Sequence, residues 1–331
     1  MMRRLVTFAA LALALAASPA SAAPAPCGAP PSAVVEPPPP REEAVLGRPT
    51  VRSIPAKPRG IIYLFHGSGG SEAFAGRLHT RRVLGPMAAA GYGFVAAPSL
   101  DRTDVRRWRV DSLDPALNPD VAYMLDLHRA LVARGEIAAN TPVFTMGMSN
   151  GGAFANLFAA AAKAQGLPVV AVANYMGPFP LAMRGDPAAL APTLTVLGQT
   201  DGLVSAVQTA EVAAALNGRG ARIEVHVAPE RRVCTTDLVL AASAPGEPER
   251  LLAQLARLGV VDAAGARTVF VSDPVIDRAD MAALGQVLAP LGATARDVLN
   301  ELLIAWGAHQ MRSDFGGRQL EFFEAALAAR K

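Results

Sequence analysis

The chain has 331 residues, of which 51% are hydrophobic and 18% are charged, and its formal net charge at pH 7 is +3. The hydrophobic fraction excludes a disordered chain, and the low charge argues against the basic surface that nucleic-acid binding needs. No apolar run approaches the roughly 18–20 residues that a membrane span requires. Two cysteines are too few for a disulfide scaffold or a four-cysteine zinc site, and no other metal-ligand spacing occurs. We therefore expect no metal and no organic cofactor.

The N-terminus has the three parts of a secretory signal peptide. Residues 1–4 are short and basic, residues 5–17 are apolar and uncharged, and residues 20–22 form a small-residue cleavage signal. We therefore predict a signal peptide over residues 1–22 and export to the periplasm or the extracellular medium. An uncleaved anchor is the alternative.

The two cysteines leave several possibilities open. Cys27 follows the signal closely, where a lipoprotein carries its acylated cysteine, but Pro24 and Pro26 are unsuitable before such a cut. After export, Cys27 could instead form a disulfide with Cys234. The sequence does not give the distance between the two thiols, so a disulfide and two free thiols are equally open.

The middle of the chain alternates short apolar runs with amphipathic stretches. Residues 23–58 come first as a Pro-rich extension, expected to be extended and to lead into one edge strand near residues 45–54. Strands are predicted at 61–65, 93–97, 143–146, 169–173, 194–197 and 223–227, and helices at 73–90, 119–134, 151–163, 205–216 and 314–329. This pattern predicts the α/β class, with βαβ units around a mostly parallel sheet covered by helices on both faces.

Between residues 229 and 308 the alternation stops. Stretches at 248–258, 274–288 and 294–306 favour helices, and the segment is too long for a connecting loop. We predict a helical cap inserted before the last helix of a domain that spans residues 59–331. Such an insertion would border the active site and limit substrate size, although its apolar stripe of leucines, at 251, 252, 255 and 258, could simply pack on the core.

The strongest chemical motif is Gly147-Met148-Ser149-Asn150-Gly151, between a predicted strand and a predicted helix. This is the context of the G-x-S-x-G nucleophile elbow, in which a tight turn exposes the serine above the sheet. Ser149 is the predicted nucleophile, and the backbone amide of Asn150 is a predicted oxyanion donor. The alternative is an ordinary serine at a glycine-rich junction.

A second glycine-rich loop, His66-Gly67-Ser68-Gly69-Gly70, follows an earlier strand and is similar to an oxyanion loop. Its small residues would let the backbone approach a substrate carbonyl. We predict that Ser68 supplies the second oxyanion amide, with Gly69 the next candidate. His66 precedes the nucleophile in the chain and is expected to shape the loop.

An acid and a base are expected after the nucleophile. Asp201 follows a predicted strand and is the predicted acid, the alternative being an N-cap of the next helix. His226 and His309 are the only histidines beyond Asp201. His226 lies within a predicted strand, whereas His309 lies before the last helix, where the base of such a triad normally sits. We therefore predict His309, with His226 as the alternative.

Together these motifs resemble the α/β-hydrolase fold, and within it secreted serine esterases related to polyhydroxybutyrate depolymerases and feruloyl esterases. The closest matches are Asp120-Val121 and Ser149-Asn150-Gly151-Gly152. The resemblance implies hydrolysis of carboxylic esters, small or oligomeric, through a Ser-His-Asp triad and an acyl-enzyme. The long cap and the scarcity of aromatic residues depart from the polymer-degrading members.

Two other functions stay open at this stage. A serine peptidase of the same fold can carry the sequence Gly-x-Ser-x-Gly-Gly, and a periplasmic binding protein could keep the fold without a working base. Neither nucleic acid nor a membrane span is expected. The acyl group, the alcohol and the oligomeric state do not follow from the sequence.

Overall fold

The computed structural model describes residues 37–183, 185–187, 190–273 and 275–330. The predicted signal peptide (1–22), the start of the Pro-rich extension and Cys27 lie outside these ranges. Within them, no helix has both the length and the apolar character of a transmembrane segment.

An eight-stranded sheet forms the centre of the described chain, in the order β1-β2-β4-β3-β5-β6-β7-β8. Its strands are β1 (Arg41–Val45), β2 (Arg48–Ser53), β3 (Gly60–Phe65), β4 (Tyr92–Ala96), β5 (Val143–Met148), β6 (Val169–Tyr175), β7 (Thr193–Gly198) and β8 (Ile223–Ala228). Neighbours from β4 to β8 pair in parallel, whereas β2 is antiparallel to both β1 and β4. The predicted α/β-hydrolase fold class is thereby confirmed.

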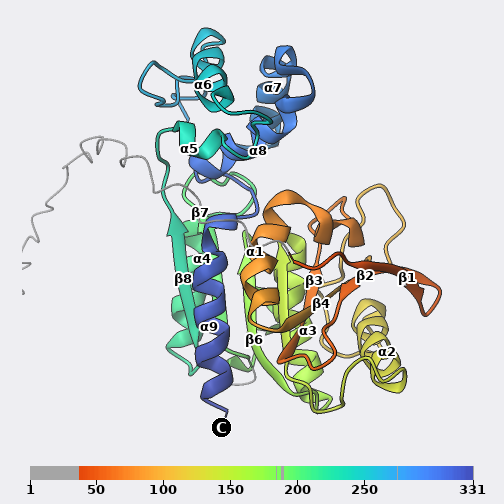
Figure 1. Cartoon of the computed structure of the whole chain (residues 1–331). Coiled ribbons are helices and arrows are strands. Elements are labelled where there is room, and N and C mark those ends of the chain that lie inside the picture. Colours follow the sequence, from red (N-terminus) through yellow and green to blue (C-terminus); the bar gives the residue numbers. More distant parts are fainter. Residues whose placement is uncertain (1–36, 184, 188–189, 274, 331) are drawn as a thin grey trace, which may run out of the picture.

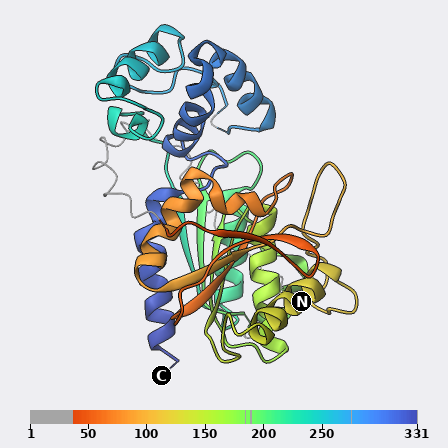
Figure 2. The same cartoon turned by 45° about the vertical axis from the view of Figure 1, so that its right-hand side comes forward.

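Helices cover both faces of this sheet (Figures 1 and 2). One face packs on α1 (Leu78–Ala89) and α9 (Gly316–Ala328), and the other on α2 (Pro119–Ala133), α3 (Asn150–Ala164) and α4 (Ala206–Asn217). Strand order reverses at β3, whose neighbours are β4 and β5. The loops after β3 and β5 therefore diverge, and in open α/β sheets ligands bind in the crevice that such a switch point leaves.

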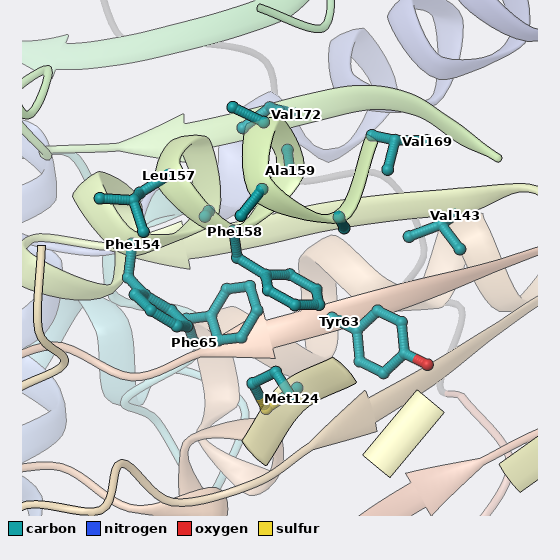
Figure 3. Close-up of a cluster of buried hydrophobic side chains, with 14 of the residues drawn as sticks. Tyr63, Phe65, Met124, Val143, Phe154, Leu157, Phe158, Ala159, Val169 and Val172 are labelled. Atoms are coloured by element: carbon teal, nitrogen blue, oxygen red, sulfur yellow. The ribbon is translucent and has the colours of Figure 1, made fainter. Parts of the chain in front are cut away.

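The β3 strand is buried along its whole length because both of its faces are covered. An apolar core lies on each face of the sheet, and alternate residues of β3 pack into one or the other. Tyr63 and Phe65 face α3, whereas Ile62 and Leu64 pack toward α1 and α9. Figure 3 shows Phe65 against Phe154 of α3, with ring centroids 4.9 Å apart and nearly perpendicular planes. Burial of each such ring contributes about 1.5–3 kcal/mol, which anchors α3 to the strand beside it.

The N-terminal edge differs from the prediction of one strand at 45–54. The chain forms a hairpin of β1 and β2, and β2 extends the main sheet. Leu46 and Gly47 make the two-residue turn, both with positive φ (54° and 72°). Leucine rarely adopts that conformation, so the turn has no sequence signal.

One predicted helix is also divided. In place of a helix at 73–90, a 3-10 helix (Glu72–Gly76) precedes α1, and Arg77 between them is extended, with ψ 141°. The helix predicted at 274–288 starts at Arg278, because Asp277 caps it through a capping box with Asp280. Both changes place an arginine at the start of a helix.

The segment between β8 and α9 contains α5 (Thr235–Leu238), α6 (Glu247–Arg257), α7 (Arg278–Val287) and α8 (Ala295–Ala305). We call this segment, residues 229–308, the cap. It lies beyond the carboxyl end of β8 (Figure 1). The cap has its own apolar core, and Leu251 and Leu255 of α6 are buried in it. The leucine stripe of α6 therefore packs within the cap and not against a substrate.

A buried polar contact joins the cap to the sheet domain. Glu301 of α8 and His79 of α1 are both almost fully buried, with Oε1 and Nε2 3.5 Å apart. Nδ1 of His79 lies 3.0 Å from the hydroxyl of Ser313. Burial raises the pKa of Glu301 to about 8 and lowers the pKa of His79 to about 4. At neutral pH both side chains are therefore mainly uncharged.

We predict that Glu301→Gln stabilises the protein near neutral pH. Between pH 4.5 and 8 the carboxyl is ionised in the unfolded chain but protonated in the folded one, so the free energy of unfolding falls as pH rises. Glutamine removes that titration. Tm from thermal unfolding should exceed wild type by on the order of a few degrees at pH 7, and the gain should vanish at pH 4. A gain independent of pH would contradict this origin.

Candidate active site

Ser149 lies in the turn between β5 and α3. Its φ of 58° and ψ of −126° are strained values for a residue with a side chain, which cost roughly 1–3 kcal/mol. The surrounding backbone holds them: the Ser149 amide donates to Tyr175 O (2.8 Å), and its carbonyl accepts from Ala153 N (3.1 Å). Such strain at a half-buried serine is the geometry of a nucleophile elbow.

The glycines around Ser149 allow three backbone segments to pack closely. A Cβ on Gly147 would overlap the carbonyl of Gly151, and a Cβ on Gly151 would overlap the carbonyl of Phe65. The start of α3 can therefore rest against the end of β3. As a result, the loop after β3 comes beside the serine, where a Cβ on Gly67 would lie 3.3 Å from the Ser149 Cβ.

Two backbone amides near Ser149 have no acceptor among the described residues. Asn150 is the first residue of α3, where an amide has no intrahelical acceptor. In the loop after β3, the Gly69 amide donates to Val105 O (2.6 Å), whereas no acceptor faces the Ser68 amide. Of the two candidates in this loop, Ser68 therefore has the amide that is available to a ligand.

His66 holds this loop in place. Its Nδ1 lies 2.7 Å from Gly67 O, and its Nε2 lies 3.1 Å from the Ser99 amide. Because a carbonyl only accepts and an amide only donates, the proton is on Nδ1. Burial lowers the pKa of His66 to about 4, so the ring stays neutral. Neither nitrogen is free to act as a base.

Trp108 supports the elbow from behind. Asn150 Oδ1 accepts from the Trp108 amide (2.7 Å), and Asn150 Nδ2 donates to its carbonyl (3.1 Å). The indole Nε1 donates to His66 O (3.1 Å), and the ring stacks on Phe154. Trp108 is fully buried, so its role is structural.

Asp201 and His309 are in direct contact although 108 residues separate them. Asp201 Oδ2 lies 2.7 Å from His309 Nδ1. The other carboxylate oxygen accepts from the amides of Leu203 (2.8 Å) and Val204 (3.0 Å). The alternative role of Asp201, capping α4, belongs to Ser205, which accepts from Gln208 N. The two amides therefore fix the position of the Asp201 carboxylate, and the carboxylate in turn fixes the orientation of the His309 imidazole.

The end of α8 positions His309. That helix ends in a Schellman motif, in which the Gly307 amide donates to Ile304 O (3.1 Å) and the Ala308 amide to Leu303 O (2.8 Å). Thr200, beside Asp201, binds the same end: its amide donates to Gly307 O (3.0 Å) and its hydroxyl to Trp306 O (2.8 Å). Asp201 and His309 are thus carried by segments that are bonded to each other.

The alternative base, His226, lies elsewhere. It is on β8, where its ring is about one-third exposed and Nε2 contacts Glu224 Oε1 (2.5 Å). It does not line the cleft that contains Ser149.

That cleft has a volume of about 580 Å³ and contains Ser149, Ser68 and His309 in its wall. Seven further residues, for which the sequence carries no signal, complete its lining. They are Phe74, Arg77, Met148, Leu203, Val204, Arg278 and Met281. Arg278 and Met281 belong to α7, so the cap borders the cleft through this helix. Within the part of the chain that the structure describes, no group of three or more His, Cys, Asp or Glu could hold a metal ion.

No family model matches the chain, and no curated protein matches it. A search of solved structures finds a carboxylesterase from Mesorhizobium loti (19% identity, TM-score 0.43, 66% of this chain and 99% of that chain). Others are an acetyl xylan esterase from Aspergillus awamori (13%, 0.41, 54% and 80%) and a Bacillus cereus carboxylesterase (16%, 0.39, 62% and 92%). Likeness at this level assigns no substrate.

We predict that Gly151→Ala disrupts the site. The added methyl group must displace the Phe65 carbonyl, and overpacking of this kind costs about 1–3 kcal/mol. Gly317→Ala is the matched control, because a Cβ there meets nothing within 4 Å. Thermal unfolding should show a lower Tm for the first variant and no loss for the second. Equal Tm values for the two variants would show that the close approach at Gly151 is unimportant.

Proposed function

We propose that this protein hydrolyses carboxylic esters, with Ser149 as nucleophile, His309 as general base and Asp201 as the acid that orients it. The observation that carries the proposal is the 2.7 Å contact between Asp201 Oδ2 and His309 Nδ1. His309 also lines the same cleft as Ser149. A buried carboxylate against Nδ1 leaves Nε2 to accept a proton, as the base of a triad must.

In the proposed reaction, His309 Nε2 takes the proton of Ser149 as the hydroxyl attacks the ester carbonyl. The amides of Ser68 and Asn150 donate to the oxyanion of the tetrahedral intermediate. His309 then returns the proton to the leaving alcohol, and an acyl group stays on Ser149. Water, activated by the same imidazole, releases the acid in a second step.

We also propose that the protein is exported. The signal-peptide pattern of residues 1–22 motivates this proposal. Fractionation of cells that express the full chain, with N-terminal sequencing of the product, tests the proposal. A cytoplasmic product that keeps Met1 would contradict it.

Ser149→Ala should abolish hydrolysis of p-nitrophenyl esters, with a loss of about 10⁴-fold or more in kcat. Its fold should persist, because the side chain is small and lies at a turn. The wild type should bind a fluorophosphonate covalently and the variant should not. Labelling of the variant at the wild-type rate would place the nucleophile elsewhere.

His309→Ala should be about as inactive as Ser149→Ala, whereas His226→Ala should retain activity because His226 lies outside the cleft. Both variants are assayed with the same esters and with a peptidyl substrate, after circular dichroism has verified folding. If the wild type cleaves the peptidyl substrate but none of the esters, the result favours a peptidase. A wild type with neither activity that fluorophosphonate does not label would favour a binding protein.

A further inference from the structure

The charged residues that line the cleft of Ser149 and His309 are all positive. Among its lining residues are two arginines, Arg77 and Arg278, and no aspartate or glutamate. They come from different parts of the fold: Arg77 precedes α1 in the sheet domain, and Arg278 begins α7 in the cap. The sheet domain and the cap therefore each contribute one cation to the lining of the cleft.

Neither arginine has a carboxylate partner within ion-pair distance among the described residues. Paired arginines occur close by in the chain. Arg231 binds Asp237 (2.6 Å) and Arg267 binds Glu230 (2.8 Å), both within the cap. Because the fold satisfies these neighbours internally, the two cleft arginines stand out as available for an external anion.

Other arginines lie close to the cleft. A smaller cavity of about 270 Å³ shares Arg77 with the cleft and also contains Arg296, with Asp297 as its only carboxylate. The pKa of His66, in the loop beside Ser149, is lowered first by burial and also by the charges of Arg77, Arg106 and Arg102. These arginines favour an anionic ligand in the cleft.

We propose that the preferred substrates are esters that carry a free carboxylate, bound by Arg77 and Arg278 while Ser149 attacks the ester carbonyl. Guanidinium groups suit this ligand because their donors match the two oxygens of a carboxylate. The inference rests on the proposed ester hydrolysis and narrows its substrate class. The carboxylate lies either on the acyl portion or on the alcohol portion of the ester, and two substrate pairs distinguish these two positions.

The test compares kcat/KM within two matched pairs at pH 7. Monoethyl succinate is paired with ethyl levulinate, and acetoxyacetate with acetoxyacetone; in each pair a methyl ketone replaces the carboxylate. We expect the carboxylate member to react at least about tenfold faster in one pair or both, since a carboxylate accepts charge-assisted hydrogen bonds from a guanidinium, which are stronger than those a neutral ketone accepts. Added salt should reduce this preference.

The arginines are then tested by substitution. Arg77→Gln and Arg278→Gln should each lower the ratio of the two kcat/KM values by about tenfold, and Arg278→Lys should retain part of the preference. Arg250→Gln, on the exposed face of α6 and outside the cleft, is the matched control and should leave the ratio unchanged. A readout by ratio cancels any general loss of active enzyme.

Two results would overturn the inference and leave ester hydrolysis intact. One is Ser149-dependent hydrolysis of the ketone esters with no preference for either carboxylate. The other is a preference that both glutamine variants keep in full. If the wild type hydrolyses none of the four esters and does not react with a fluorophosphonate, the proposed function itself fails, and the inference fails with it.

Discussion

The geometry of the candidate active site depends on a backbone junction between the end of β7 and the end of α8. Gly198 and Gly307 meet there without side chains, since a Cβ on Gly198 would overlap the carbonyl of Gly307. Thr200 then ties the two segments with its amide and its hydroxyl. Asp201 and His309 follow directly on either side of this junction, so their 2.7 Å contact is a consequence of it. The oxyanion loop and the elbow are built separately, on β3 and β5.

The cap is consequently part of the site's framework. Ile276, in the segment before α7, forms a backbone bridge with the acid loop: its amide donates to Thr200 O (2.8 Å), and its carbonyl accepts from Gly202 N (3.1 Å). Together with α8, this bridge attaches the cap to the acid loop at two places. A loosely hinged lid would lack such bonds. The cap contributes to the cleft wall through α7, while the end of α8 positions His309, the proposed base.

Much of this arrangement could be predicted from the sequence because its signals are local. The elbow requires glycines at fixed positions around Ser149, and the strands that are covered on both faces form continuous apolar runs. His309 could be selected from chain order and the short supply of histidines. By contrast, Leu46 makes a turn that its side chain disfavours. Arg77 and Arg278 are 201 positions apart in the chain and become neighbours of one cleft only through the docking of the cap.

The 108-residue separation of Asp201 and His309 also has a meaning for folding. Closing so long a loop in an unfolded chain carries a large entropy cost, which grows only slowly with further length. The cap has a hydrophobic core of its own, and the folded cap holds Ile276 and Gly307 on Thr200. The folding of the cap therefore contributes to the stability of the contact between Asp201 and His309. If heating melted the cap first, Asp201 and His309 would separate while the sheet persisted, and loss of the proposed esterase activity would precede the loss of strand structure.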